Sequence, residues 1–95
     1  MAAPTEAAPL YFVYVLGCSR GDDCRTYVGW TMDLDRRLAQ HNAGTGAKST
    51  RGRDWMLLYA ERCETKSEAM RREWRIKHDR KFRLTLLAPH RVERV

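Results

Sequence analysis

A short, dense run of apolar side chains near the start of the chain limits the folds that are open to it. Residues 11–16 read YFVYVL, and every side chain in this run is aromatic, β-branched or aliphatic. A membrane-spanning helix needs about 20 apolar residues, whereas a run of about four to eight is typical of a buried strand. We therefore predict a buried strand over residues 11–16 and no membrane partner.

Turn and capping signals divide the rest of the chain into short elements. A polar stretch at residues 17–24 predicts a loop, and a strand on each side of it favours an antiparallel hairpin. Thr65 begins a capping box with Glu68, and Pro89 is expected to end the last helix. The expected elements are strands over residues 11–16, 25–29 and 55–60, a helix from Thr31 or Asp33 to about Asn42, a helix from Thr65 to about His78, and a shorter helix over residues 79–88.

The order of these elements, β-β-α-β-α-α, predicts an α+β fold in which a small three-stranded antiparallel sheet is flanked by helices. Residues 10–88 would form one domain, in keeping with a chain of 95 residues. The Ala- and Pro-rich residues 1–9 are expected to be a disordered lead, and residues 89–95 a C-terminal tail. Three cysteines, an odd number, do not predict a disulfide framework, and this favours a cytoplasmic location.

The charge balance favours a polyanionic partner. Lys and Arg number 18 against 12 Asp and Glu, which gives a net charge of +6. Of these cations 14 are Arg, whose planar guanidinium matches the geometry of phosphate. A basic surface that is merely well solvated is the alternative, but nucleic acid is the interpretation that the excess of arginine supports.

The first predicted helix places charge where a core residue is expected. Leu34 and Leu38 define its apolar stripe, and the helical spacing puts Arg37 and His41 on the same face. Charges at the edge of a core are costly unless they are paired or used by a functional site. This face is therefore a candidate for function.

The second predicted helix repeats the arrangement. Its apolar stripe is expected at Met70 and Trp74, with Glu73 and Lys77 beside it, while Arg71, Arg72 and Arg75 would face solvent or phosphate. One interpretation is a structural salt bridge between Arg37 and Glu73 that links the two helices. The other is a functional site, which the additional pair of His41 and Lys77 favours.

Four ordered motifs of the chain resemble the GIY-YIG nuclease family. Phe12-Val13-Tyr14 and Tyr27-Val28-Gly29 are similar to the paired motifs of that family, although Phe12 stands where the family name has Gly. Arg37, with a His four positions later, is similar to the Arg motif, and Glu73 to the helix that bears the metal-binding Glu. The resemblance extends over residues 11–87, and it implies an endonuclease that hydrolyses DNA phosphodiester bonds.

The resemblance also implies roles for individual residues. Glu73 would ligate a single Mg²⁺ or Mn²⁺, and Arg37 would bind the scissile phosphate. Tyr27 would be the general base or would orient the attacking water. His41 is a rival base because an imidazole titrates near neutral pH. Tyr14 could hydrogen-bond the water or Tyr27, or it could simply pack in the core.

The subfamily that the chain resembles implies branched or flapped DNA as substrate, a role in DNA repair or recombination, and a protein partner that supplies targeting. Trp30 is expected to stack on an unpaired base, and Trp55 to pack in the core. Lys77 could contact phosphate or pair with Glu73. The loop at residues 44–53 is expected to seat a DNA backbone through Lys48, Ser49, Thr50, Arg51 and Arg53. The alternatives are a nucleic-acid-binding module without catalysis and a protein-interaction domain.

Overall fold

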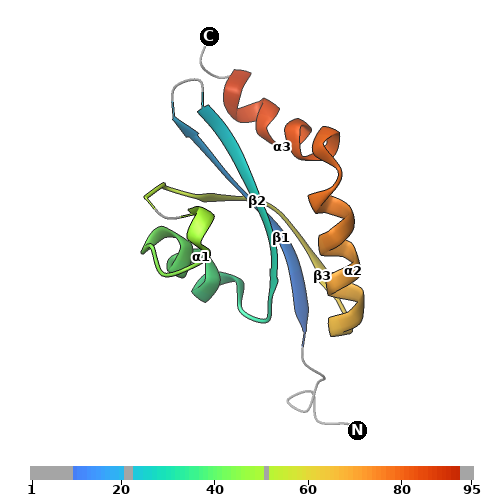
Figure 1. Cartoon of the computed structure of the whole chain (residues 1–95). Coiled ribbons are helices and arrows are strands. Elements are labelled where there is room, and N and C mark those ends of the chain that lie inside the picture. The colour runs from blue at the N-terminus through green and yellow to red at the C-terminus, as the bar shows by residue number, and fades with distance from the viewer. Residues whose placement is uncertain (1–9, 21–22, 51, 93–95) are drawn as a thin grey trace, which may run out of the picture.

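Three antiparallel strands and three α-helices form the fold, in the predicted order β-β-α-β-α-α (Figure 1). The structure is a computed structural model that describes residues 10–20, 23–50 and 52–92. The elements are β1 (Tyr11–Arg20), β2 (Asp23–Thr31), α1 (Leu34–Asn42), the 3₁₀ turn η2 (Lys48–Thr50), β3 (Met56–Cys63), α2 (Lys66–Lys77) and α3 (Arg80–Val92). Their sheet has the order β2-β1-β3, so the predicted α+β class with a three-stranded antiparallel sheet is confirmed.

The first two strands are longer than the sequence predicted. The loop expected at residues 17–24 is mostly strand, because the β1–β2 register runs without a break from Phe12↔Thr31 to Arg20↔Asp23. Gly17 looked like the start of a turn, but it is a buried strand glycine. A Cβ at Gly17 would lie 2.4 Å from Cδ1 of Leu58, so the glycine leaves room for that side chain over the strand.

The last helix continues beyond the point at which it was predicted to stop. Pro89 was expected to end it, but α3 runs on to Val92. A proline removes one backbone donor and crowds the preceding turn, and both costs are local to that turn. Three more residues therefore still fit in the helix. Within the described residues, no helix is long and apolar enough to span a bilayer.

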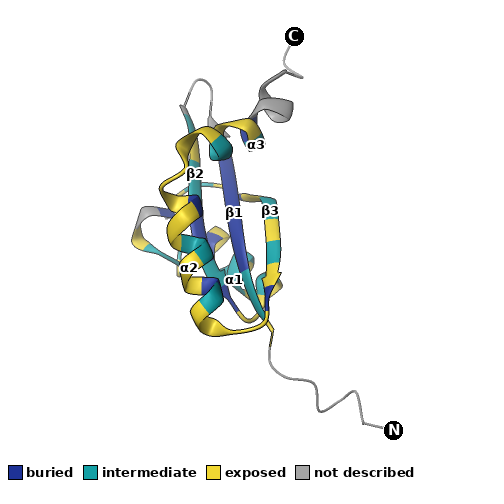
Figure 2. Ribbon diagram, turned by 90° about the vertical axis from the view of Figure 1, so that its right-hand side faces the viewer, coloured by how far each residue is buried: buried dark blue, intermediate teal, exposed yellow. Residues whose placement is uncertain are grey.

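The sheet separates two apolar clusters, and β1 contributes to both. Val13 and Val15 point to the side of α2 and α3, where they pack with Val28 and Ile76. On the α1 side the cluster is formed by Tyr14, Leu16, Cys18 and Trp55, with Tyr27, Leu34 and Leu38 packed against it. Figure 2 shows the consequence, since the central strand is buried along most of its length.

The buried face of α2 differs from the predicted one by one residue. Met70 and Trp74 were expected to face the core, but they are 49% and 61% exposed. The residues that pack on the sheet are instead Ala69 and Ile76. Arg72, predicted to face solvent, lies on this buried side and binds Glu61 of β3, with 2.9 Å between Nη2 and Oε1.

This corrected register makes a prediction about stability. Replacing Ile76 by Ala should lower the free energy of unfolding by about 2–5 kcal/mol, because it removes a buried side chain and leaves a cavity. Met70→Ala is the matched control, and it should change that free energy by less than about 0.5 kcal/mol. Urea denaturation of the two variants measures both values. A larger loss for Met70→Ala than for Ile76→Ala would restore the register predicted from the sequence.

Candidate functional site

The end signals of α1 determine where its side chains point. Asp33 is the N-cap, and its carboxylate accepts a hydrogen bond from the Arg36 N–H at 3.1 Å. After the helix, Gly44 has a φ of +83°, a backbone conformation that glycine adopts without strain. Between these two signals the helix turns His41 into the protein, where the side chain is 1% exposed.

His41 is the middle of a buried chain of hydrogen bonds. Thr50 donates its single hydroxyl proton to the Ala47 carbonyl at 2.8 Å, so it can only accept from Nδ1 of His41, also at 2.8 Å. The proton on Nδ1 leaves Nε2 of the neutral ring as an acceptor. Tyr14 lies 3.0 Å from that Nε2 and therefore donates to it.

Electrostatics agree with this direction of donation. Burial lowers the pKa of His41, and the nearby Arg37 lowers it further, so the ring stays neutral. The pKa of Tyr14 is raised, mainly by burial and then by Tyr27, while Arg37 opposes the rise and Glu73 adds a smaller increase. Tyr14 is therefore a protonated donor. The same shift places Tyr27, Arg37 and Glu73 within electrostatic reach of one buried hydroxyl.

A glycine makes room for the two tyrosines. Gly29 of β2 is paired with Tyr14 of β1 in the sheet. A Cβ on Gly29 would lie 2.6 Å from the Tyr14 hydroxyl oxygen and 3.1 Å from Cε2 of Tyr27, which no real Cβ could occupy without displacing the rings. Sequence reasoning noted Gly29 only as part of a motif. Its backbone angle is ordinary, so only the neighbours of the missing Cβ reveal the constraint.

Tyr27 is the more accessible of the two tyrosines. It is partly exposed, and its ring packs 4.8 Å from that of His41 and 6.3 Å from that of Tyr14, measured between centroids. Tyr14 and both nitrogens of His41 are already engaged in hydrogen bonds in the interior, so Tyr27 is the partly exposed residue of these three aromatic side chains.

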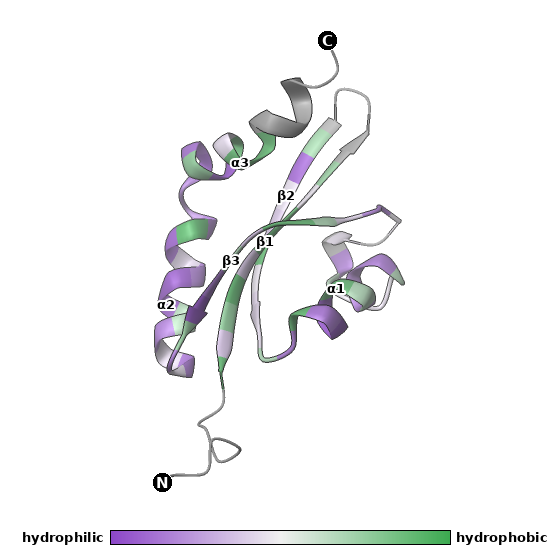
Figure 3. Ribbon diagram, turned by 180° about the vertical axis from the view of Figure 1, so that it is seen from behind, coloured by the Kyte–Doolittle hydropathy of each residue, from purple (hydrophilic) through white to green (hydrophobic). Residues whose placement is uncertain are grey.

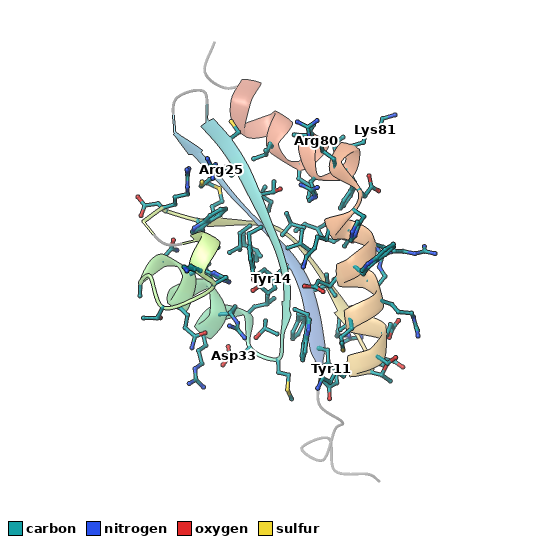
Figure 4. All side chains as sticks on the ribbon, in the orientation of Figure 1. Tyr11, Tyr14, Arg25, Asp33, Arg80 and Lys81 are labelled. Atoms are coloured by element: carbon teal, nitrogen blue, oxygen red, sulfur yellow. The ribbon has the colours of Figure 1, made fainter. Side chains whose placement is uncertain are left out.

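Arg37 and Glu73 approach this group from opposite faces of the sheet. Arg37 belongs to α1 and Glu73 to α2, and Figure 4 shows Tyr14 between these helices. Within the described part of the chain the two do not form an ion pair with each other. The Glu73 carboxylate instead lies 3.3 Å from Nζ of Lys77. The structural salt bridge, one of the two interpretations of this charge pattern, is therefore not formed between these helices.

A surface groove of about 600 Å³ lies where β2 ends and α1 begins. Arg37 and Trp30 are both part of its lining, and Tyr27 and Glu73 are not. The lining residues are Trp30, Thr31, Met32, Asp33, Arg36, Arg37 and Gln40. Trp30 is half-buried there, with Tyr11 on one side and Nζ of Lys66 5.7 Å from the ring centroid.

The loop predicted to seat DNA divides into inward and outward side chains. Thr50 is fully buried and belongs to the chain of hydrogen bonds through His41, so its hydroxyl faces His41 and not DNA. Arg53 is half-buried and donates to Sγ of Cys18 at 3.6 Å, while Lys48 is exposed. Arg51 and the side chain of Ser49 lie outside the described residues.

Asn42 is a second residue that sequence reasoning missed. Its side-chain amide makes two hydrogen bonds with the backbone of Trp55. It donates to the Trp55 carbonyl and accepts from the Trp55 N–H. The indole N–H of Trp55 in turn donates to the Thr50 carbonyl at 2.8 Å. These bonds hold the segment that carries Thr50 against α1. An exposed Asn at a helix end gives no sign of this in the sequence.

Glu73 is the residue of this group that could hold a metal ion. Its side chain is 23% exposed, so a carboxylate oxygen can meet solvent. Among the residues that the structure describes, no three His, Cys, Asp or Glu side chains cluster as a ready metal site. A lone carboxylate suits a hard cation such as Mg²⁺, which keeps several waters and takes further oxygens from a substrate.

Comparison with known proteins gives a consistent family. The family model described as the GIY-YIG catalytic domain matches residues 10–85. A UPF0213 protein of Halobacterium salinarum is 54% identical over 69 residues, which are 72% of this chain and 86% of the relative. One from Lactiplantibacillus plantarum is 44% identical and covers 97% of this chain and 92% of its own. The solution NMR structure of a UPF0213 protein from Bacillus halodurans has 40% identity and a TM-score of 0.47, with 82% of this chain and 84% of that chain covered.

The neutral state of His41 makes a prediction about pH. Its pKa is lowered in the folded protein, so on acidification the unfolded chain binds the proton first, starting near a pH of about 6.5. Folding stability should therefore decrease as the pH falls below that value. The variant His41→Gln should show a shallower decrease between neutral and mildly acidic pH, measured by urea denaturation at a series of pH values.

The matched control is His78→Gln, which removes an exposed imidazole in place of the buried one. An unchanged slope in His41→Gln, together with a reduced one in His78→Gln, would show that His41 is not the residue held neutral by burial.

Proposed function

Because the chain belongs to the GIY-YIG family and its relatives are UPF0213 proteins, we propose that it is a nuclease that hydrolyses phosphodiester bonds of DNA with a divalent metal ion. The observation that carries the proposal is the convergence on Tyr14. Tyr27, Arg37 and Glu73 all act on the pKa of its buried hydroxyl. They come from a strand and from two helices on opposite faces of the sheet. A purely structural core has no need to bring these three groups together.

Arg37 is proposed to bind the scissile phosphate. Arg37 is part of the lining of a surface groove that is also lined by Arg36. A planar guanidinium can donate two parallel hydrogen bonds to phosphate oxygens and stabilise the charge that develops on them in the transition state. The net charge of +6 supports DNA as the polyanion that enters this groove.

Glu73 is proposed to hold one Mg²⁺ or Mn²⁺. When bound, such an ion would stabilise negative charge on the phosphoryl group and on the departing oxygen. Lys77, which now pairs with the carboxylate, is 54% exposed on a flexible stem and can leave it for a phosphate. The residues present therefore fit a single hard cation that is also coordinated by substrate and water.

Tyr27 is proposed to orient the attacking water. It is partly exposed, whereas Tyr14 and His41 are buried and bonded to each other. His41 packs against the Tyr27 ring, and Thr50 fixes the tautomer of His41. Tyr14, His41 and Thr50 are thus proposed as positioning residues. This arrangement favours Tyr27 over His41 as the group that meets water.

Branched or flapped DNA, and a role in repair or recombination, form the finer part of the proposal, and they rest on the family resemblance. A nucleic-acid-binding module without catalysis is the second candidate. One observation favours it, which is that the Glu73 carboxylate is paired with Lys77. The two candidates differ in a single measurable outcome, the appearance of metal-dependent products.

The first prediction from this proposal concerns Arg37 and Glu73. Arg37→Ala and Glu73→Gln should each lower the rate of Mn²⁺-dependent nicking of linear, flapped and four-way DNA on the order of 10²–10³-fold. Arg62→Ala and Glu64→Gln remove equivalent charges from exposed positions on β3 and just after it, and should cut like the parent. Binding to DNA without any products in the parent protein would instead support the non-catalytic module.

The second prediction concerns the group that meets water. Tyr27→Phe should reduce kcat on the order of 10²-fold with little effect on KM, because the ring still packs while the hydroxyl is lost. Tyr11→Phe, a half-buried strand tyrosine outside the site, serves as control. Retained cleavage in Tyr27→Phe, with complete loss in His41→Gln, would transfer the role to His41.

A further inference from the structure

The outward face of α2 carries a stripe of one methionine and two aromatic side chains that the proposed chemistry does not use. Met70, Trp74 and His78 follow one another at four-residue intervals and so share one side of the helix. Trp74 is 61% exposed and Met70 49%, and His78 is exposed as well. Figure 2 shows exposed residues along the side of α2 that faces away from the sheet. A tryptophan this exposed stands out in a chain of this size.

Two rings of the stripe are held in a defined geometry. The Trp74 and His78 rings are stacked, with their centroids 4.2 Å apart and their planes at 29°. A carbonyl can only accept, so Nδ1 of His78 donates to the Trp74 carbonyl at 2.7 Å. This bond fixes the imidazole beside the indole. The result is a preorganised aromatic platform on the surface.

The platform lies in a basic setting. Arg71 and Arg75 each follow a residue of the stripe by one position, and both are exposed. Neither makes an ion pair within the part of the chain that the structure describes. The ribbon in Figure 3, coloured by hydropathy, is hydrophilic along much of α2. Arg80 and Lys81 extend the exposed positive charge past the end of the helix. Unpaired guanidinium groups beside a flat ring match a phosphate backbone with bases that can stack.

We propose that the outer face of α2 binds an unpaired strand of DNA. Bases would stack on Trp74 and His78, and phosphates would pair with Arg71 and Arg75. A second copy of this chain is a poorer occupant, because a two-fold contact would bring the same cations together. The choice of DNA rests on the proposed function. Glu73 precedes Trp74 directly, so the unpaired strand would pass close to the proposed metal carboxylate, as a flap beside a cut would.

The test is binding of fluorescein-labelled oligothymidylate to the full chain in EDTA, followed by anisotropy. Trp74→Ala should weaken this binding about 5- to 150-fold, the loss expected for one stacked base. Trp74→Phe should keep most of the affinity because it keeps an aromatic face. Leu84→Ala removes another exposed apolar side chain, on α3, and should bind like the parent. Arg71→Ala should reduce the slope of log affinity against log salt by about one.

Three outcomes would overturn the inference. The first is equal binding by Trp74→Ala and the parent. The second is equal weakening by Trp74→Phe and Trp74→Ala, which would remove stacking as the cause. The third is self-association in sedimentation experiments that Trp74→Ala abolishes while oligothymidylate binding is kept, which would make a second copy the occupant.

The absence of metal separates this test from that of the nuclease. Binding that depends on Trp74, in a protein that produces no cleavage with Mn²⁺, would support the inference and contradict the proposed activity. Cleavage with Mn²⁺ by a protein whose oligothymidylate binding does not depend on Trp74 would support the proposed activity and contradict the inference.

Discussion

The chain of hydrogen bonds from Tyr14 through His41 to Thr50 is the interaction on which the rest of the site depends. Buried polar groups must find partners when they lose water, and these three find them in one another and in the Ala47 carbonyl. The chain joins the central strand, the last turn of α1 and the segment that follows it. Its members leave no buried donor unsatisfied, so the position of α1 and the protonation state of the site are determined by the same bonds.

The order of the elements and the motif residues could be predicted from the sequence, because both depend on local signals. The run at residues 11–16 predicts a strand whatever lies beside it, and the Thr65 capping box starts a helix in the predicted place. The interruption of an apolar stripe by Arg37 and His41 was also visible in the helical period. It identified His41 as unusual, although not which partners the ring would have.

What the sequence did not reveal depends on contacts between distant residues. Gly17 and the polar residues after it are typical of a turn, and only the pairing of Gly17 with Thr26 and Met56 makes it part of a strand. The α2 register was predicted from its largest apolar side chains, but Ala69 and Ile76 pack on the sheet instead, and Arg72 binds Glu61 of β3. Thr50 was assigned to DNA as part of a flexible, cation-rich loop, and its actual partner, His41, is nine residues away.

The shift of the α2 register also changes what that helix can do. Successive side chains on a helix are rotated by about 100°, so three adjacent stripes can face three environments. Ala69 and Ile76 face the sheet, Glu73 is half-buried within electrostatic reach of Tyr14, and Trp74 faces solvent. Had Trp74 packed in the core as predicted, its side chain could contact no ligand. Because the small Ala69 takes the place against the sheet, the large ring is left outside. The packing of a small side chain against the sheet thus leaves the large ring available to the proposed DNA strand, next to the proposed metal ligand.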